Sequence, residues 1–333
     1  MIIFPRTRAA AVLMLVVASM AEAATEGVTI ATFNIHYIAP AGEGPHMAHE
    51  RSDGSAGDAG SGSDWGGALG WKNRRDAVVR TIAAAQAHII AFQEMESFAR
   101  GPWNPENVQQ DYLAEHFPGY AWGATGEPPA FPNTQPVMYR EDRFTEVDKG
   151  FFFFFSGTPD LPFSQSWAGR FPVFASWTLL EERAGTQEPR PDRGHARLYV
   201  YNVHFDAGSR ENRRRAARLV LERVQRREHP GAPVIILGDF NAPCFFYPVE
   251  LYRDAGFWVS DASGSTYHFN RGLDLLPAID HILVSPDLKI TETRVDRRRY
   301  EGTFPSDHYL VAAEVERVRQ RPRVAAGRGH PVY

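Results

Sequence analysis

The chain of 333 residues contains a single cysteine, Cys244, so it can form no intramolecular disulfide and has no cluster of thiolates for zinc or iron–sulfur binding. We interpret Cys244 as a small packing residue. No H-E-x-x-H segment is present, which argues against the common helical zinc motif. The chain also lacks a basic excess, because its formal net charge is −4. This balance weakens, without excluding, tight binding to duplex nucleic acid through phosphate contacts.

A long hydrophobic run is also missing, because a membrane-spanning helix needs about 20 apolar residues and the longest run, Ala9–Met20, is shorter. Arg6 and Arg8 precede this run, and the small-x-small sequence Ala-Glu-Ala follows at 21–23. This order is typical of an export signal that is cleaved after residue 23. An uncleaved anchor is the alternative. Removal of two arginines and one glutamate would change the net charge from −4 to −5. We therefore predict an exported protein, periplasmic or secreted.

Hydrophobic periodicity predicts an α/β protein in which helices recur between groups of strands in mixed sheets. Helical spacing predicts two amphipathic helices, over 73–87 and 209–227. The five phenylalanines at 151–155 are apolar on both faces, which favours a central strand. Together with that segment, short apolar runs predict strands over 28–33, 88–92, 174–180, 198–205, 233–237, 279–284 and 309–315.

Residues 39–70 are rich in Gly, Ser, Ala and Asp and show no hydrophobic period, so we predict a flexible loop there. It follows the first strand and could lie over a site as a lid. Its two histidines, His46 and His49, are interpreted as solvated loop residues. The basic segment 319–333 is predicted to be a disordered tail, which leaves 24–318 as one catalytic domain.

Polar side chains follow several predicted strands. Asp239 and Asn241 come directly after the apolar run 233–237 and lie two positions apart, so they leave the strand on one face. Each such residue also has an ordinary explanation as a turn, a cap or a satisfied core histidine, and Glu94 could simply pair with Arg74 or Arg75. The candidates are Asn34, Glu94, His204, Asp239, Asn241, Asp280, Asp307 and His308.

These side chains are rich in oxygen ligands. Hard cations such as Mg²⁺ or Mn²⁺ prefer carboxylate and water, and Mg²⁺ commonly takes only one or two protein carboxylates. Glu94, alone or with Asp307, would be enough.

In their order along the chain, these segments resemble the endonuclease/exonuclease/phosphatase superfamily, which includes pancreatic deoxyribonuclease, abasic-site endonucleases, bacterial sphingomyelinases and deadenylases. The resemblance spans nearly the whole mature chain. It is carried by Ala31–Asn34, Trp71 with Arg74 and Arg75, Phe92–Glu94, Val137–Arg140, Ser156–Pro159, Arg170, Asn202–His204, Gly238–Asn241, Ile279–Ile282 and Ser306–His308.

The resemblance implies a four-layer α/β/β/α sandwich of two mixed sheets flanked by helices, with the site at one rim. It implies that Glu94 holds a divalent metal with Asn34 close by, and that Asp307 supports the metal or the histidine. Asp239 would orient or deprotonate the attacking water, which Asn241 would fix in place.

The same resemblance implies four groups around the phosphate. His308, its ring held by Asp280, would contact the scissile phosphate. His204 and Asn34 would lie at other phosphate oxygens. Arg170 would either face the phosphate or form a surface salt bridge.

Two surface segments have open interpretations. The segment 297–300, three arginines and a tyrosine, is either a phosphate-tracking loop or, as we favour, a solvated turn. The segment 245–247, Phe-Phe-Tyr, is expected to pack in the core, although it could line a binding surface for a base or a lipid. Arginines 213, 214, 215 and 218 are expected to form a solvated helix face.

Two classes of function remain at this point. The first is an exported metal-dependent phosphoesterase, with a nuclease-type diesterase preferred over a phosphomonoesterase or a phospholipase-C-like enzyme. The expected partner is then a phosphate-ester substrate, nucleic acid first and phospholipid or a small phosphate ester next. The second is an idle relative that only binds a partner, which the complete residue set disfavours. The oligomeric state stays open, with a monomer assumed.

Overall fold

The computed structural model of the chain describes residues 27–38, 68–95, 106–154, 156–164, 173–183 and 196–318. Within these ranges it contains two six-stranded mixed sheets and four α-helices. The predicted signal peptide, Arg170, the predicted tail and most of the 39–70 segment lie outside the described residues.

The first sheet has the spatial order β11-β12-β1-β2-β4-β3. Its two inner strands β1 and β2 run parallel, and all its other neighbours are antiparallel. The bounds are β1 (Val28–Asn34), β2 (Ile89–Gln93), β3 (Tyr120–Gly123), β4 (Val137–Arg140), β11 (Leu288–Asp296) and β12 (Leu310–Arg317).

The second sheet has the spatial order β5-β6-β7-β8-β10-β9. Here β7 and β8 form the parallel pair, and the other neighbours are antiparallel. The bounds are β5 (Phe144–Phe153), β6 (Phe174–Glu182), β7 (Arg197–His204), β8 (Val234–Asp239), β9 (Trp258–Val259) and β10 (Asp280–Val284).

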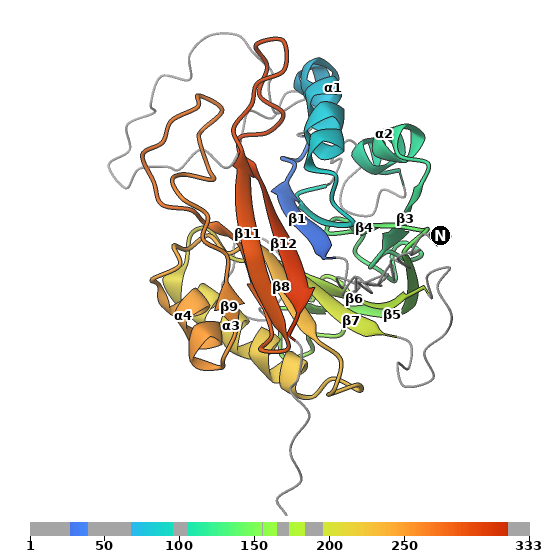
Figure 1. Cartoon of the computed structure of the whole chain (residues 1–333), viewed down its shortest axis with the longest axis vertical. Coiled ribbons are helices and arrows are strands. Elements are labelled where there is room, and N and C mark those ends of the chain that lie inside the picture. The colour runs from blue at the N-terminus through green and yellow to red at the C-terminus, as the bar shows by residue number, and fades with distance from the viewer. Residues whose placement is uncertain are drawn as a thin grey trace, which may run out of the picture.

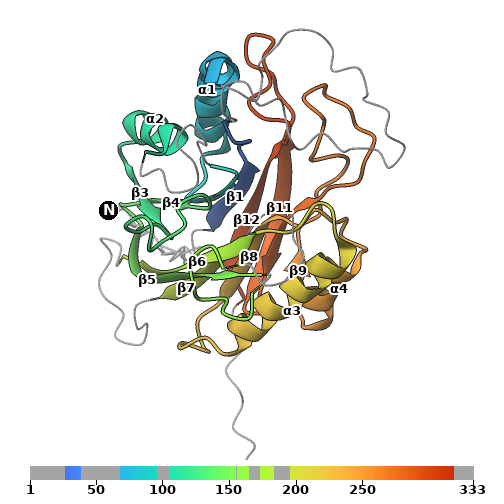
Figure 2. The same ribbon diagram turned by 180° about the vertical axis from the view of Figure 1, so that it is seen from behind.

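Helices cover the outer face of each sheet, so the molecule has four layers (Figure 1, Figure 2). Each parallel pair needs a crossover helix, which is why α1 follows β1 and α3 follows β7. Helices α1 and α2 lie on the first sheet, and α3 and α4 on the second. Their bounds are α1 (Ala68–Ala85), α2 (Val108–His116), α3 (Arg210–Gln225) and α4 (Tyr247–Asp254). This architecture confirms the predicted fold class.

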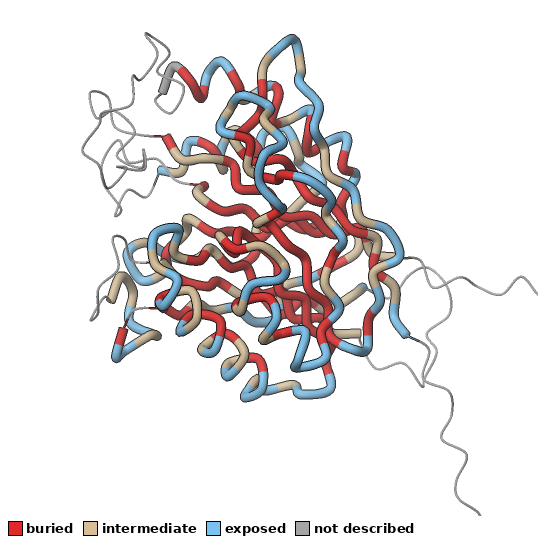
Figure 3. The backbone as a smooth tube through the Cα atoms, turned by 90° about the vertical axis from the view of Figure 1, so that its left-hand side faces the viewer, coloured by how far each residue is buried: buried red, intermediate tan, exposed pale blue. Residues whose placement is uncertain are grey.

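The layers are held by three apolar cores. Between the two sheets, Ile89 and Val200 belong to one fully buried cluster. A second cluster joins α1 to the first sheet, and a third joins α3 and α4 to the second sheet. Buried residues therefore run through the centre of the molecule, while exposed residues line the outer helices and loops (Figure 3). Each fully buried large aliphatic side chain contributes about 2 kcal/mol, so these cores fix the strand ends rigidly.

The expectation for 151–155 is wrong in one respect. The described part of this segment ends β5, which is the edge strand of the second sheet and not a central one. Its apolar character has another cause. Phe152 and Phe154 pack into the core beneath α3, while Phe151 meets Phe131 from a loop, so both faces of this edge are covered.

Several elements differ from the sequence patterns. Helix α1 begins at Ala68, five residues before the predicted start, because Trp71 in its first turn is buried in the core. Strand β11 was not predicted. It is an edge strand whose alternate residues are exposed and polar, so its apolar signal is weak. Helix α2, the short α4 and strands β3, β4 and β9 were likewise not predicted as elements.

The segment 245–247 also differs from expectation. Phe245 and Phe246 are 57% and 42% exposed, so they do not pack in the core as predicted. Cys244 beside them is half-buried against the core cluster, as expected for a packing residue. Among the described residues, no helix is both long and apolar enough to cross a membrane.

Candidate active site

The strand registers gather the candidate residues at one edge of both sheets. Asn34 and His204 end parallel strands β1 and β7, and Asp239 ends β8. His204 is directly beside Asp239 in the β7–β8 pair, and Asp280 is directly opposite Asp239 in the β8–β10 pair. Because carboxyl ends of parallel strands meet at one edge, segments far apart in sequence deliver their polar groups to the same place.

Asp239 lies at the centre of this group and is 2% exposed. Its Oδ1 accepts a hydrogen bond from the backbone N–H of Asn241 (2.8 Å), and its Oδ2 accepts one from Asn34 Nδ2 (3.2 Å). The Nε2 atoms of His204 and His308 each lie 3.7 Å from the same Oδ2. Both oxygens of Asp239 therefore face polar groups from other strands.

Gly238 makes room for this arrangement. Its φ of +145° lies in a region that favours glycine, and a Cβ built there would stand 1.9 Å from the carbonyl oxygen of Val203 on β7. A side chain at this position would therefore push β8 away from β7, where His204 and Asp239 face each other. The requirement for glycine explains the first residue of the Gly-Asp-Phe-Asn segment.

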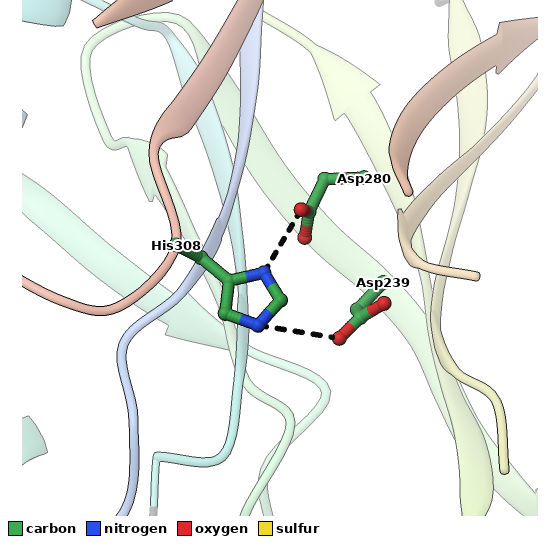
Figure 4. Close-up of side chains that lie close together, drawn as sticks. All are labelled: Asp239, Asp280 and His308. Atoms are coloured by element: carbon green, nitrogen blue, oxygen red, sulfur yellow. Dashed lines mark hydrogen bonds and ion pairs between the residues drawn. The ribbon is translucent and has the colours of Figure 1, made fainter. Parts of the chain in front are cut away.

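His308 is held between two carboxylates (Figure 4). Its Nδ1 lies 2.9 Å from Asp280 Oδ2, and its Nε2 points toward Asp239 Oδ2 at 3.7 Å. Burial would lower the pKa of His308, but Asp280 and Asp239 together raise it well above its ordinary value. The raised pKa favours the imidazolium form, whose Nδ1–H donates to Asp280 Oδ2 and whose Nε2–H forms an ion pair with Asp239.

Burial, followed by the charge of Asp280, raises the pKa of Asp239 to about 6. The two neighbouring histidines and the N–H of Asn241 oppose this shift only in part. A carboxylate with a pKa near 6 is ionised at neutral pH and yet basic enough to take a proton from water in a transition state.

Glu94 joins the group from the end of β2. Its Oε1 accepts a hydrogen bond from Asn34 Nδ2 at 3.0 Å and lies 3.7 Å from His204 Nε2. Asn34 thus bridges Glu94 and Asp239, which come from different sheets. Asn241 links the segments after β7 and β8, since its Nδ2 donates a hydrogen bond to the carbonyl oxygen of Phe205 at 2.8 Å.

Asp307 lies on the other side of Glu94, with His36 between them. His36 Nδ1 is 3.4 Å from Asp307 Oδ2 and 3.7 Å from Glu94 Oε2. Burial of Asp307 favours its neutral form, but His36, His308 and Arg74 together outweigh this effect, so the pKa of Asp307 is lowered. Asp307 was predicted from the sequence and His36 was not, although His36 is only two residues after Asn34.

A buried arginine ties the two loops of this corner together. Arg74 is completely buried, and its guanidinium donates to the carbonyl oxygens of Ile35 (2.6 Å), Pro305 (2.9 Å) and His36 (2.7 Å). Burial lowers its pKa to about 10, so it stays charged at neutral pH. Arg74 was predicted from the sequence as part of a motif, and the charges of Asp307 and Glu94 oppose the effect of burial on its pKa.

Tyr267 is a further neighbour that no pattern predicted, because it lies in the loop before β10. Its ring centroid is 4.8 Å from that of His308 and 4.4 Å from that of Phe269, which is 39% exposed. Burial raises the pKa of Tyr267, and the negative charges of Asp307, Glu94 and Asp239 add to that shift. Its hydroxyl is therefore neutral at neutral pH.

The described donor groups fit a hard divalent cation. Asp239, Asp280 and His308 each offer a ligand atom within 4.8 Å of one another. One buried oxygen of this group, Asp280 Oδ1, has no hydrogen-bond partner within the described residues. The corner formed by Asn34, Glu94 and Asp307 offers further oxygen atoms. Carboxylate and amide oxygens are the ligands that Mg²⁺ and Mn²⁺ prefer.

Comparisons with known proteins agree with this fold. A curated relative, the uncharacterized protein L388 of Acanthamoeba polyphaga mimivirus, is 27% identical over 176 residues, 51% of this chain. The chain spans 59% of the length of that relative. A mannosyl-6-phosphatase of Bacteroides thetaiotaomicron has a similar fold, with a TM-score of 0.64, 23% identity and coverage of 87% and 99% of the two chains. D. rerio TDP2 complexed with a single-stranded DNA product gives a TM-score of 0.58 at 13% identity, with coverage of 87% and 99%.

The model of one family matches residues 31–308, a stretch that begins in β1 and ends at His308. That stretch contains the described site residues at both ends of the chain and in between. The protein therefore belongs to the Endonuclease/Exonuclease/phosphatase family.

Proposed function

We propose that the protein is a phosphodiesterase in which Asp239 deprotonates the attacking water. The observation that carries this proposal is the buried Asp239 with a pKa of about 6, facing the protonated His308 at 3.7 Å. A base and a cationic donor side by side are what in-line attack of water on a phosphate needs. Asn241 would hold this water in position, because its own N–H donates a hydrogen bond to Asp239 and its side chain donates one to the carbonyl oxygen of Phe205.

The other polar groups would bind the phosphate. His308, oriented by Asp280, donates its Nε2–H toward the non-bridging oxygens, where negative charge grows in the transition state. His204 and Asn34 approach the same Oδ2 of Asp239 and would hold further oxygens. Arg170 stays a prediction, since it lies outside the described residues.

We assign the divalent metal, Mg²⁺ or Mn²⁺, to Glu94, with Asn34 and Asp307 beside it. The alternative is the group of Asp239, Asp280 and His308, but there the protonated ring already supplies a positive charge between the two carboxylates. A bound cation would neutralise charge on the phosphate and on the leaving oxygen.

A nucleic acid strand is our preferred substrate. Tyr267 and Phe269 place two aromatic rings beside His308, and a base of a single strand stacks on such rings at a gain of about 1–3 kcal/mol. The arginines at 297–299 support duplex binding less, because Arg297 and Arg299 lie against Tyr309 and Phe304 and Arg298 pairs with Asp296.

A phosphomonoesterase acting on a small ester is the second candidate. It is supported by the fold likeness to the mannosyl-6-phosphatase and by the net charge of −4, which does not favour a long polyanion. Phospholipids are a third class of substrate to test, because the exposed rings of Phe245 and Phe246 could contact a lipid.

The proposal is tested with protein lacking residues 1–23, in Mg²⁺ or Mn²⁺, on a single-stranded oligonucleotide, supercoiled plasmid, mannose 6-phosphate and phospholipid vesicles. We expect metal-dependent cleavage of the single strand that is lost in EDTA and in the Asp239→Asn variant. Release of phosphate from mannose 6-phosphate without strand cleavage would replace the diesterase with a monoesterase. Retained activity in Asp239→Asn would overturn the role of Asp239.

We also propose that the chain is exported, while its oligomeric state stays open with a monomer assumed. The proposal rests on the charged, apolar and small-residue order of the first 23 residues. Expression of the full chain in a bacterium, followed by fractionation and N-terminal sequencing, tests this. An intact N-terminus in the cytoplasmic fraction would overturn it, and size-exclusion chromatography of the mature protein tests the oligomeric state.

A further inference from the structure

Helix α3 carries a row of arginines, although the chain as a whole is acidic. The segment 210–218 contains five arginines and one glutamate, which gives a local charge of +4, whereas the whole chain has a net charge of −4. Arg210, Arg214 and Arg218 are four residues apart, so they lie on one side of the helix, about 6 Å from one another along its axis. A straight row of positive charges suits a linear polyanion, whose phosphates also form a row.

The acids in the described part of the chain leave this row largely unneutralised. Arg210 and Arg218 lie within ion-pair distance of none of them, and Arg214 has only Glu211, whose Oε2 is 3.9 Å from the Arg214 Nε. The two remaining arginines of the segment bind other groups, since one donates to backbone carbonyl oxygens and the other pairs with Glu211. The charge of the row is therefore available to a phosphate, which a guanidinium group binds through two N–H donors.

Tyr247, the first residue of α4, holds two arginines of the row in place. Its ring centroid lies 4.4 Å from Arg214 Cζ and 5.4 Å from Arg218 Cζ, and its hydroxyl accepts a hydrogen bond from Arg218 Nε at 2.8 Å. A stacked guanidinium group keeps its positive charge while it loses part of its side-chain freedom. The tyrosine therefore orders the row before any ligand binds.

Two exposed rings extend this surface. The Phe246 ring centroid lies 6.0 Å from Arg210 Cζ, and the rings of Phe245 and Phe246 pack edge to face with centroids 5.1 Å apart. Exposed aromatic rings beside arginines suit a single-stranded nucleic acid, whose bases stack on the rings while its phosphates contact the cations. The α3 patch consists of Arg210, Arg214, Arg218, Phe245, Phe246 and Tyr247.

The α3 patch lies close to the candidate active site along two connections of the chain. Helix α3 follows β7, which ends at His204, and the segment 240–246 follows β8, which ends at Asp239. Phe245 is four residues after Asn241, so their backbones are within about 14 Å of each other. Helices α3 and α4 lie side by side on the outer face of the second sheet (Figure 2). A strand bound at Asp239 therefore needs only a short extension to reach the patch.

We propose that the α3 patch binds single-stranded nucleic acid beside the active site, with phosphates on the arginine row and bases on Phe245 and Phe246. This inference rests on the phosphodiesterase proposed above and specifies how that enzyme holds its substrate. An anionic membrane surface also suits arginines and exposed phenylalanines, but its phosphates are spread over a plane. The single row of charges therefore favours the strand.

The order of the layers places Asp239 between the α3 patch and Tyr267. Tyr267 contacts His308, which precedes β12 of the first sheet, whereas the patch belongs to the helices outside the second sheet. Asp239 ends β8 of the second sheet, which is the layer between them. A strand that contacts both aromatic groups passes over Asp239 with nucleotides on either side of the bond that breaks, so we expect cleavage at internal bonds.

Fluorescence anisotropy of a labelled single strand of about 16 nucleotides, with the full chain in EDTA, measures binding without cleavage. The informative variant is Arg210→Gln/Arg218→Gln. Arg223→Gln/Arg226→Gln, which removes the same charge from the same helix at two arginines that pair with acids, is the matched control. Each lost phosphate contact lowers the slope of log affinity against log salt by about 0.7, so we expect a change of about 1.4 in the first variant and none in the control.

The ring contacts have a separate signature. Phe245→Leu/Phe246→Leu should weaken binding of the strand about tenfold, without changing the salt slope, and should not weaken binding of an abasic strand of equal length. Leucine is about as apolar as phenylalanine, so the same variant should keep any affinity for a phospholipid vesicle. Loss of binding to the strand with bases alone would therefore identify stacking.

Two measurements separate the α3 patch from the reaction on which it rests. Bis(p-nitrophenyl) phosphate is a diester too short to reach the patch, so its kcat/KM with metal should be the same in the wild type and in all these variants. If this diester is hydrolysed but Arg210→Gln/Arg218→Gln binds the strand with the wild-type salt slope, the patch is wrong and the phosphodiesterase stands. A wild type that cleaves neither this diester nor the strand would overturn the phosphodiesterase itself. Binding to anionic phospholipid vesicles that is lost in the arginine variant, with unchanged binding of the strand, would assign the patch to a membrane.

Discussion

Replacing Asp239 with asparagine should stabilise the folded protein while it removes the activity. The pKa of the buried carboxyl rises from 3.8 to about 6, so it binds protons more readily in the folded state than in the unfolded chain. Its contribution to stability is therefore present at low pH and is lost as pH rises through about 6. At about 1.36 kcal/mol per unit, ionised Asp239 destabilises the fold by about 3 kcal/mol at pH 7.5.

Asparagine removes that charge and keeps nearly the same shape. The change also loses the bond that Asn34 Nδ2 donates to Asp239 Oδ2, at a cost of about 1 kcal/mol. Asp239→Asn should therefore be about 2 kcal/mol more stable than the wild type at pH 7.5. At pH 4.5 most folded wild-type molecules already carry the proton, so the two proteins should be about equally stable.

The assay is urea unfolding in EDTA at both pH values, followed by tryptophan fluorescence, beside kcat measured with metal. Asp254→Asn, at an exposed position at the end of α4, serves as control and should change stability by less than about 0.5 kcal/mol. Loss of the base should lower kcat by at least about 100-fold. A variant that is less stable than the wild type at pH 7.5, or an equal difference at both pH values, would refute the reasoning.

Three further predictions concern the same site. In a pH–rate profile, the kcat/KM of the wild type should rise about tenfold per pH unit below about 6, because Asp239 ionises there. It should then stay level well above pH 6.5, because the pKa of His308 is raised, and a decline near pH 6.5 would contradict this. Arg74→Met should lower the free energy of unfolding by about 3 kcal/mol and also lower kcat, because three backbone carbonyls lose a charged donor. Urea unfolding measures the stability and initial rates measure kcat, and Arg74→Lys should recover part of the stability and part of kcat. In steady-state assays, Tyr267→Leu should raise KM about tenfold for a single-stranded oligonucleotide, with little change in kcat, and should not change KM for an abasic strand of equal length. An equal rise in KM for both strands would exclude base stacking on Tyr267.

The sequence predicted the fold class and most of the site for related reasons. Buried parallel strands such as β1 and β8 are short apolar runs, and the polar residue that ends each run is visible without a structure. The central strands therefore have the clearest sequence pattern, and they also end in the polar residues of the site. The order of those segments along the chain carried the family resemblance, which implied the four-layer fold that the two six-stranded sheets confirm.

The structural features that could not be predicted from the sequence depend on contacts between distant segments. Edge strands β5 and β11 were misplaced or missed, because the residues that cover an edge come from elsewhere in the chain. Tyr267 was missed for a similar reason. It reaches His308 through a bridge between two loops, and neither loop has a period that predicts it.

His36 and Asn34 show the same limit at short range. They are two residues apart, yet only Asn34 carries a strand-end signal, and His36 reaches Asp307 because three buried side chains hold its backbone in the left-handed region. A strained residue has no sequence pattern of its own, since the strain is maintained by its surroundings. The buried charge of Asp239 is a similar case, in which the sheets maintain a group that opposes folding at neutral pH. A purely structural cluster would gain nothing from either feature, so their presence together at one edge of the sheets is what favours catalysis over an idle binding protein.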